Sequence, residues 1–274
     1  MKIARVFPTQ TSMSPDDPDA YFGRPGLFTP HYDEIHISVA FTWDIPKAEW
    51  LRKQWEHIAP VKIGGPAIDG EPRDGFKAGM YLRRGITITS RGCPNKCPWC
   101  FVNCDLIELG DFPEGNVVQD NNILACSKSH LDKVFQMLSK QKGIDFRGGL
   151  DSRFLKDWHV EALRGLKIGA LWLAYDHPAI KPHFLKAIEK LKRYFRRDQL
   201  RCYVLIGYGN DTLDKAEGRL RFVYEVGALP FAMLYRDHSG DYPSPPRQWR
   251  QFQRKWARPA IYKSFFKSEG EKKK

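Results

Sequence analysis

A long hydrophobic run is absent from this sequence. The mean hydropathy is −0.51, and no apolar stretch approaches the roughly 20 residues that a membrane-spanning helix requires. The opening residues, MKIARVFPTQ, also lack the apolar segment of an export signal. We therefore expect a cytoplasmic protein that has no membrane partner.

Cysteines are few and unevenly placed. The chain of 274 residues contains six, and four of them lie between Ser90 and Cys104. Small disulfide scaffolds carry cysteines along their whole length, and thiols stay reduced in the cytosol. A disulfide framework is therefore disfavoured, and the crowding of thiols in one loop indicates a metal site.

Acidic residues are outnumbered, because 32 Asp and Glu face 44 Lys and Arg, giving a net charge of +12. The segment from Pro243 to Lys274 has a net charge of +8, and six aromatic residues are interleaved with its basic ones. Such a pattern can bind nucleic acid, but it can also be an amphipathic helix that docks its aromatic side chains on the rest of the protein. We favour docking. The overall positive charge favours an anionic substrate, such as a nucleotide or nucleic acid.

Strand-like apolar runs recur at a regular interval between residues 85 and 236, with amphipathic helices in several of the gaps. This alternation predicts a parallel sheet wrapped by helices, an α/β fold. We expect a partial (β/α)6 TIM-like barrel rather than an open doubly wound sheet. The six runs begin near Ile86, Val117, Ile144, Ala170, Leu200 and Pro230.

Residues 1–84 contain apolar runs at Ile3–Phe7, at Asp33–Phe41 and after Pro60, with a helical pattern after Asp44. We expect a small Rossmann-like α/β unit there. Residues 237–274 form a basic, aromatic tail in which we expect no strand and one short helix.

The cysteine loop has the spacing Cys93-x3-Cys97-x2-Cys100 and follows the first predicted strand of the barrel. It therefore lies at the carboxyl edge of the sheet, where α/β proteins build their sites. Three thiolates can bind three irons of a 4Fe–4S cluster and leave the fourth iron open to another ligand. A zinc site would need Cys104 as a fourth ligand within a cramped loop. We favour the cluster; with zinc, the protein would be a non-catalytic nucleic-acid-binding protein.

The motif Cys93-x3-Cys97-x-Trp99-Cys100 after a strand resembles the signature of the radical S-adenosylmethionine (SAM) superfamily. The resemblance covers residues 85–236. It implies a 4Fe–4S cluster on the three cysteines, whose open iron binds SAM. It also implies reductive cleavage of SAM to a 5′-deoxyadenosyl radical that abstracts hydrogen from a substrate. A one-electron donor such as flavodoxin or ferredoxin would be the partner, and the substrate stays unidentified.

The same resemblance assigns further residues, all at the ends of successive predicted strands. Asp120 and Asn122 would contact the SAM amino group, and Asp151 and Arg153 its ribose and carboxylate. Ile206 would pack on adenine, and Trp99 would lie beside the cluster. The alternatives are ordinary: each aspartate could cap a helix, and Arg153 could form a solvated ion pair.

Residues 1–84 also resemble part of the cobalamin-binding domain that precedes many radical SAM cores. The Asp-x-His-x-x-Gly motif that supplies a histidine to cobalt is absent, because His31, His36 and His57 stand in other contexts. We therefore expect no cobalamin. Of the remaining thiols, Cys202 is expected in the core, and Cys126 is either buried or a hydrogen-atom donor.

Overall fold

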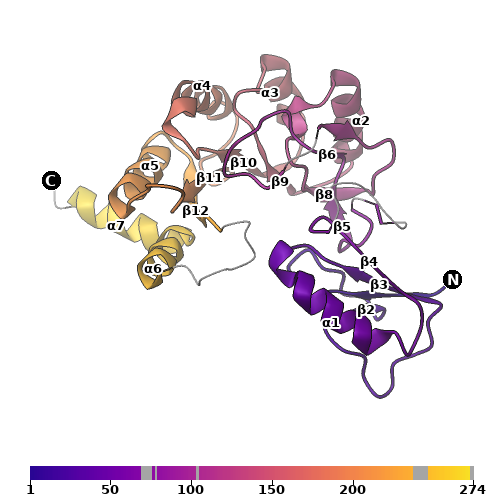
Figure 1. The fold of residues 1–274 in the computed structure, drawn as a ribbon. Coiled ribbons are helices and arrows are strands. Elements are labelled where there is room, and N and C mark those ends of the chain that lie inside the picture. Colours follow the sequence, from indigo (N-terminus) through magenta and orange to yellow (C-terminus); the bar gives the residue numbers. More distant parts are fainter. Residues whose placement is uncertain (69–75, 78, 103–104, 237–245, 272–274) are drawn as a thin grey trace. The chain divides into compact units, whose positions relative to one another are not determined.

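The computed structural model describes residues 1–68, 76–77, 79–102, 105–236 and 246–271 (Figure 1). The chain divides into two compact units, with the division between Ile88 and Thr89 and with the C-terminal helices in the second unit. Within the described residues, no helix combines the length and the apolar character that crossing a membrane requires.

The first unit is a four-stranded parallel sheet with one α-helix, α1 (Ile45–Trp55), which follows a single 3-10 turn, η1 (Thr42–Asp44). Alternate residues of its central strand point to α1, so that Ile35 and Ile37 are buried with Leu51 and Trp55. The strands and the helix agree with the elements that the sequence predicts. In sheet order the strands are β2 (Ala20–Tyr21), β1 (Ile3–Val6), β3 (Glu34–Ser38) and β4 (Val61–Gly64).

The second unit contains five strands of a six-stranded sheet whose strands follow one another in chain order. The first strand of this sheet, Gly85–Thr87, precedes the division in the chain. A doubly wound sheet reverses this order at a switch point, whereas a barrel wall does not; the order here is compatible with a partial α/β barrel. All six predicted strands are confirmed. They are β5 (Gly85–Thr87), β8 (Gly115–Val118), β9 (Ile144–Leu150), β10 (Ile168–Ala174), β11 (Leu200–Ile206) and β12 (Leu229–Leu234).

Helices lie along one side of this sheet (Figure 1). Alternate strand residues such as Phe146, Leu173 and Val204 are buried in a core with the apolar side chains of these helices, for example Leu131 and Leu220. This period of two is the sign of a strand with two different faces. The four helices are α2 (Lys128–Ser139), α3 (Asp157–Arg164), α4 (Lys181–Leu191) and α5 (Leu213–Glu225).

The opposite face of the sheet carries aromatic and charged residues. The indole of Trp172 stacks on Tyr203 with the ring centroids 4.5 Å apart. The indole N–H donates to Asp145 over 2.9 Å, and the Tyr203 hydroxyl donates to the Arg147 carbonyl over 2.9 Å. Every polar group of these two aromatic side chains therefore has a partner, as buried polar groups need.

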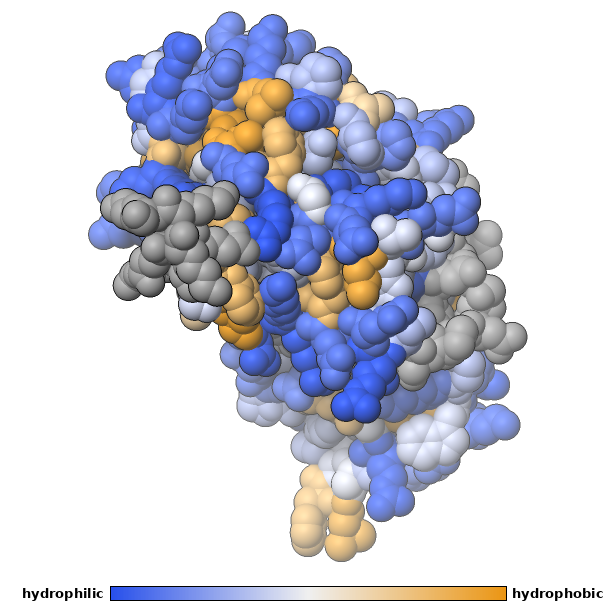
Figure 2. Space-filling view, turned by 90° about the vertical axis from the view of Figure 1, so that its left-hand side faces the viewer, coloured by the Kyte–Doolittle hydropathy of each residue, from blue (hydrophilic) through white to orange (hydrophobic). Residues whose placement is uncertain are grey.

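The C-terminal tail docks on the second unit, as the aromatic pattern predicts. Trp256 and Tyr262 are almost completely buried in the main core. The prediction of a single short helix is wrong, because α6 (Arg247–Trp256) is followed by α7 (Pro259–Glu271). Proline at the first position of α7 is compatible with a helix start. Figure 2 views the molecule from the side of α7 and shows a mostly hydrophilic surface with smaller apolar patches.

Strands β8 and β9 approach each other so closely at their carboxyl ends that only glycine fits at position 148. A Cβ atom there would lie 2.1 Å from the Asp120 carbonyl oxygen and 2.7 Å from the Asp120 backbone nitrogen. Both obstacles are backbone atoms, which cannot rotate away as a side chain would. The glycine therefore fixes the spacing of two strand ends that carry predicted site residues.

We expect Gly148→Ala to lower the free energy of unfolding by about 2 kcal/mol or more, because the added methyl group overpacks a rigid site. Denaturation in urea would measure the change. Gly110→Ala is the matched control, since nothing lies within 4 Å of a Cβ at that position. Equal stability of the two variants would contradict this account of Gly148.

Candidate functional site

The three cysteines of the predicted cluster lie in the loop that follows a short strand, β6 (Ser90–Arg91), which pairs with β7 (Ile107–Glu108). All three are free thiols, and Cys100 N–H donates to the Cys97 carbonyl to close a turn. Burial raises the pKa of the Cys100 thiol, and negative charge on Cys97 and Cys93 raises it further. The thiols are thus near enough to interact electrostatically.

Within the described residues, no three His, Cys, Asp or Glu side chains converge as they would on a single metal ion. The thiolates of a 4Fe–4S cluster each bind a different iron, so a cluster does not require three side chains to converge on one ion. Cys104, the fourth ligand of the alternative zinc site, lies outside the described residues.

Asp120 fastens the start of the cysteine loop to the end of β8. One carboxylate oxygen accepts the Thr89 N–H over 2.7 Å. The other accepts the Thr89 hydroxyl over 2.6 Å and the Ser90 hydroxyl over 2.7 Å. Burial raises the pKa of Asp120, and these three donors oppose the rise. The side chain that was predicted to contact SAM is therefore occupied in positioning the loop.

Asn121 gives a second attachment, which the sequence analysis missed. Its side-chain oxygen accepts the N–H of Gly92, the residue before the first cysteine, over 3.0 Å. Gly92 has a φ of +80°, a conformation that favours glycine. Asp120 and Asn121 thus together hold the backbone that leads into Cys93.

Asn122 and Asn95 both donate to the sulfur of Cys93. The distances are 3.3 Å from the Asn122 amide, 3.5 Å from the Asn95 amide and 3.4 Å from the Asn95 backbone N–H. Both amides also donate to one oxygen of Asp151, over 3.3 and 2.7 Å. The structure therefore brings two predicted residues, Asn122 and Asp151, to the first cysteine, together with Asn95, which the sequence analysis missed.

Asn122 has one atom without a partner. The residue is only 3% exposed, and its side-chain oxygen is buried with no hydrogen-bond donor among the described residues. Leaving such an acceptor unsatisfied costs about 1–3 kcal/mol. A buried, unpaired acceptor beside a cysteine sulfur is a place where a donor group of a ligand would be stabilised.

Arg153 pairs with Asp151 in a fork, with Nη2 and Nε at 2.7 and 2.9 Å from its two oxygens. This pairing raises the pKa of Arg153, burial opposes the rise, and Cys97 adds to it. The guanidinium therefore places a permanent positive charge next to the second cysteine. Arg153 thus forms the ion pair that was the alternative prediction, and it also lies next to the cysteine loop.

Trp99 lies among residues from two strand ends, those of β10 and β11. Its indole stacks with His177 at a centroid distance of 6.0 Å and meets Tyr208 edge-on at 5.7 Å. Burial raises the pKa of Asp176 to about 6, and hydrogen bonds from Leu205 N–H and Trp99 oppose the rise. His177 and Tyr208 were not predicted as site residues. Their position in the sequence, an aromatic ring shortly after the end of a predicted strand, could have indicated them.

Ile206 lies elsewhere. Its side chain, which was predicted to pack on adenine, is fully buried in the core on the helix side of the sheet. Cys202, on the same face of β11, is also fully buried, as expected. Cys126 is buried too, and burial raises its pKa to about 11, so its thiol stays protonated at neutral pH.

Comparisons with known proteins give little guidance. No family model matches the chain. The mitochondrial phosphatidate cytidylyltransferase of Mus musculus is 24% identical over 160 residues, which cover 55% of this chain. The match spans 42% of that enzyme's length. A similarity this low and partial does not assign a family.

We expect Asp120→Asn to lower the free energy of unfolding by about 1–3 kcal/mol, because one amide oxygen must replace a carboxylate that accepts three hydrogen bonds. Urea denaturation gives the magnitude, and hydrogen exchange should show faster exchange at the Thr89 amide. Asp111→Asn, at an exposed position, should leave both unchanged. Unaltered protection at Thr89 would show that Asp120 does not hold the loop.

Proposed function

We propose that the protein is a cytoplasmic radical SAM enzyme. The observation that carries the proposal is the environment of Cys93. This thiol lies on a loop at the carboxyl edge of the sheet with two other free thiols. It accepts three N–H donors and is adjacent to a buried acceptor that has no partner. In this proposal the sheet is the wall of a partial (β/α)6 TIM-like barrel.

The residues present suit the group that the proposal requires. Cys93, Cys97 and Cys100 would each bind one iron of a 4Fe–4S cluster, and Asn95 and Asn122 would stabilise the charge on the first thiolate. The unpaired oxygen of Asn122 would accept from the amino group of SAM. When bound and reduced, the cluster supplies the electron that cleaves SAM to methionine and a 5′-deoxyadenosyl radical.

The roles of the other residues follow from their contacts. Asp120 orients the loop and does not itself contact SAM. Arg153, held in place by Asp151, presents a cation to the carboxylate of SAM, a pairing that guanidinium groups form well. Trp99, which stacks on His177 and meets Tyr208 edge-on, shields the loop from water. The electron donor would be a flavodoxin or ferredoxin, and the positive net charge favours an anionic substrate.

The decisive assay starts from anaerobically purified protein reconstituted with iron and sulfide. We expect SAM and dithionite to yield 5′-deoxyadenosine, and we expect Cys93→Ala, Cys97→Ala and Cys100→Ala each to abolish it. Cys202→Ala is the control, because this thiol is buried in the core and is not a predicted cluster ligand. Bound zinc with no deoxyadenosine would favour the zinc-stabilised nucleic-acid-binding protein. A cluster without SAM cleavage would indicate an electron carrier.

The hydrogen bonds to Cys93 should tune the cluster. Donors to a thiolate stabilise the reduced, more negative state, so Asn122→Leu should lower the midpoint potential. Loss of one such bond is worth about 1 kcal/mol, or tens of millivolts for one electron. An EPR-monitored redox titration measures the shift. Asn116→Leu is the control, since Asn116 donates only to the carbonyls of Lys142 and Gly143. Equal potentials in the two variants would show that Asn122 plays no part.

A further inference from the structure

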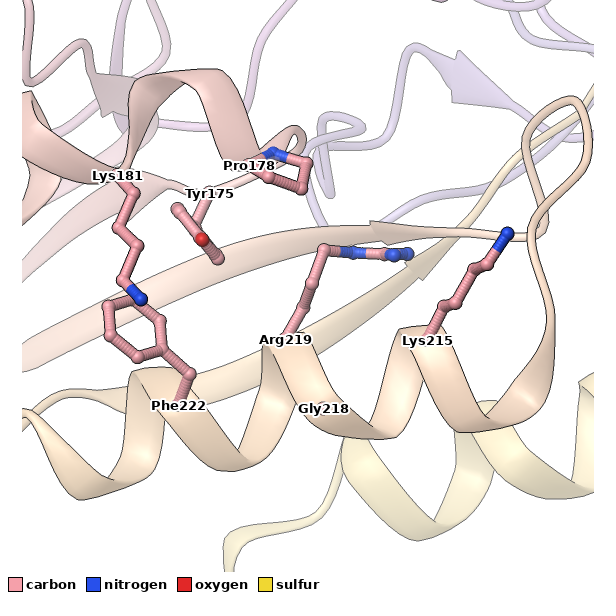
Figure 3. A pocket seen from close by; sticks show the side chains of 7 residues that line it. All are labelled: Tyr175, Pro178, Lys181, Lys215, Gly218, Arg219 and Phe222. Atoms are coloured by element: carbon pink, nitrogen blue, oxygen red, sulfur yellow. The ribbon is translucent and has the colours of Figure 1, made fainter.

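A cavity of about 340 Å³ opens between α4 and α5, on the helix side of the sheet. This volume lies at the lower end of the range of small-molecule sites, roughly 300–1,000 Å³. Figure 3 shows its lining, which comes from the end of β10, from a 3-10 turn (η3, Pro178–Ile180) and from the two helices. The lining residues are Tyr175, Pro178, Lys181, Lys215, Gly218, Arg219 and Phe222.

Helix α5 uses two different stripes of its surface. Ala216, Leu220 and Val223 are buried in the core. The cavity is lined instead by residues 215, 218, 219 and 222, which have the i, i+3, i+4, i+7 spacing of a single helix face. Of this second face only Phe222 packs against the core, so the composition of the rest needs another explanation.

Gly218 is the residue on that face that packing does not explain. It stands in the middle of α5, where glycine is the least favourable residue apart from proline. Its φ is not in the left-handed region, and a Cβ added there would have no described atom within 4 Å. Neither the backbone nor a neighbour thus requires glycine. Absence of a side chain does, however, keep the floor of the cavity open.

The charge around the cavity is positive. Arg219 is already paired, since its guanidinium binds both oxygens of Asp211 over 2.7 and 3.1 Å. Lys181 and Lys215 form no ion pair among the described residues. The Lys181 ammonium lies 4.7 Å from the centre of the Phe222 ring, and that of Lys215 is 3.5 Å from the Asn210 carbonyl.

The helix ends add to this potential. Lys181 is the first residue of α4, and Lys215 lies in the first turn of α5. The amino end of a helix carries a partial positive charge and favours phosphate groups. Two such ends therefore flank a cavity that already has two lysines without carboxylate partners.

One wall of the cavity is apolar. The rings of Tyr175 and Phe222 are in contact, with centroids 5.1 Å apart, and Tyr175 is buried. In Figure 3, Phe222 and Lys181 lie at one end, and Lys215 and Arg219 rise from α5 towards the other. A ligand that fits must combine a compact anion with an apolar or planar part.

We propose that this cavity binds a phosphate ester of the nucleotide type. Its phosphate pairs with Lys215 at one end of the cavity, and its planar part lies over Gly218 against Phe222, next to Lys181 at the other end. The proposal does not depend on the radical SAM function. The phosphate could come from a free nucleotide or from the backbone of a single-stranded nucleic acid, and the probes below separate the two.

The test measures binding by calorimetry to the full chain with three probes. These are uridine monophosphate, inorganic phosphate and a single-stranded oligonucleotide. A pyrimidine nucleotide is chosen so that binding at a site for the adenine of SAM cannot account for the result. We expect the nucleotide to bind more tightly than inorganic phosphate. If the oligonucleotide binds still more tightly than the nucleotide, with an affinity that falls steeply with salt, the natural ligand is a nucleic acid. If it binds equally or more weakly, the natural ligand is a free nucleotide.

Two variants change the site in different ways. Lys181→Glu with Lys215→Glu reverses its charge, and Gly218→Leu fills its floor with a residue that favours a helix. We expect each to weaken nucleotide binding by about tenfold or more. The matched control is Lys186→Glu with Lys192→Glu, which makes the same charge change at exposed positions of the α4 region and should alter binding by less than about twofold.

Three results would overturn the proposal. The wild type could bind none of the probes at millimolar concentration. Gly218→Leu, shown to be folded by circular dichroism, could bind the nucleotide as tightly as the wild type. Inorganic phosphate could bind as tightly as the nucleotide, which would deny a role to the apolar wall.

Discussion

The buried carboxylate of Asp120 is the constraint on which the rest of the site depends. It receives three hydrogen bonds from Thr89 and Ser90, so the residues that lead into the cysteine loop cannot move independently of β8. The backbone of the same residue is fixed from the other side by Gly148, where only a hydrogen atom fits. The segments that follow β5, β8 and β9 are thereby held together around Asp120. This restrains the start of the cysteine loop.

From this anchor the polar groups form a chain of shared partners. Asp151 accepts from Arg153, Asn95 and Asn122, and the two amides then reach Cys93. Each donor is thus held by a second contact, which limits the entropy that it could lose when a ligand binds. Of the side chains named in this network, all of them in the described part of the chain, Asn122 is the one whose buried oxygen stays unsatisfied. In a network that otherwise pairs its polar groups, one local violation of this kind is expected at a functional position.

The sequence predicts the elements well because their signals are local. Apolar runs give all six strands, and the thiol spacing gives the loop. The contacts of Asn95, Asn121 and His177 could not be predicted, because each joins segments that only the fold brings together. The burial of Ile206 has a local signal, because Cys202, Val204 and Ile206 alternate along β11 and share the core face. Helix α7 was missed because the packing partner of its aromatic residues, Trp256, lies in the preceding helix. Tyr262 and Phe266 contact Trp256 only in the folded protein.

The cavity and the cysteine loop are linked through the backbone of the same residue, Leu205. Leu205 N–H donates to Asp176 over 3.0 Å, and Leu205 carbonyl accepts from Arg219 over 2.9 Å. Asp176 also meets Trp99 of the loop, and Arg219 is a wall of the cavity. A ligand that pulled on Arg219 would therefore act on the strand end that supports Trp99.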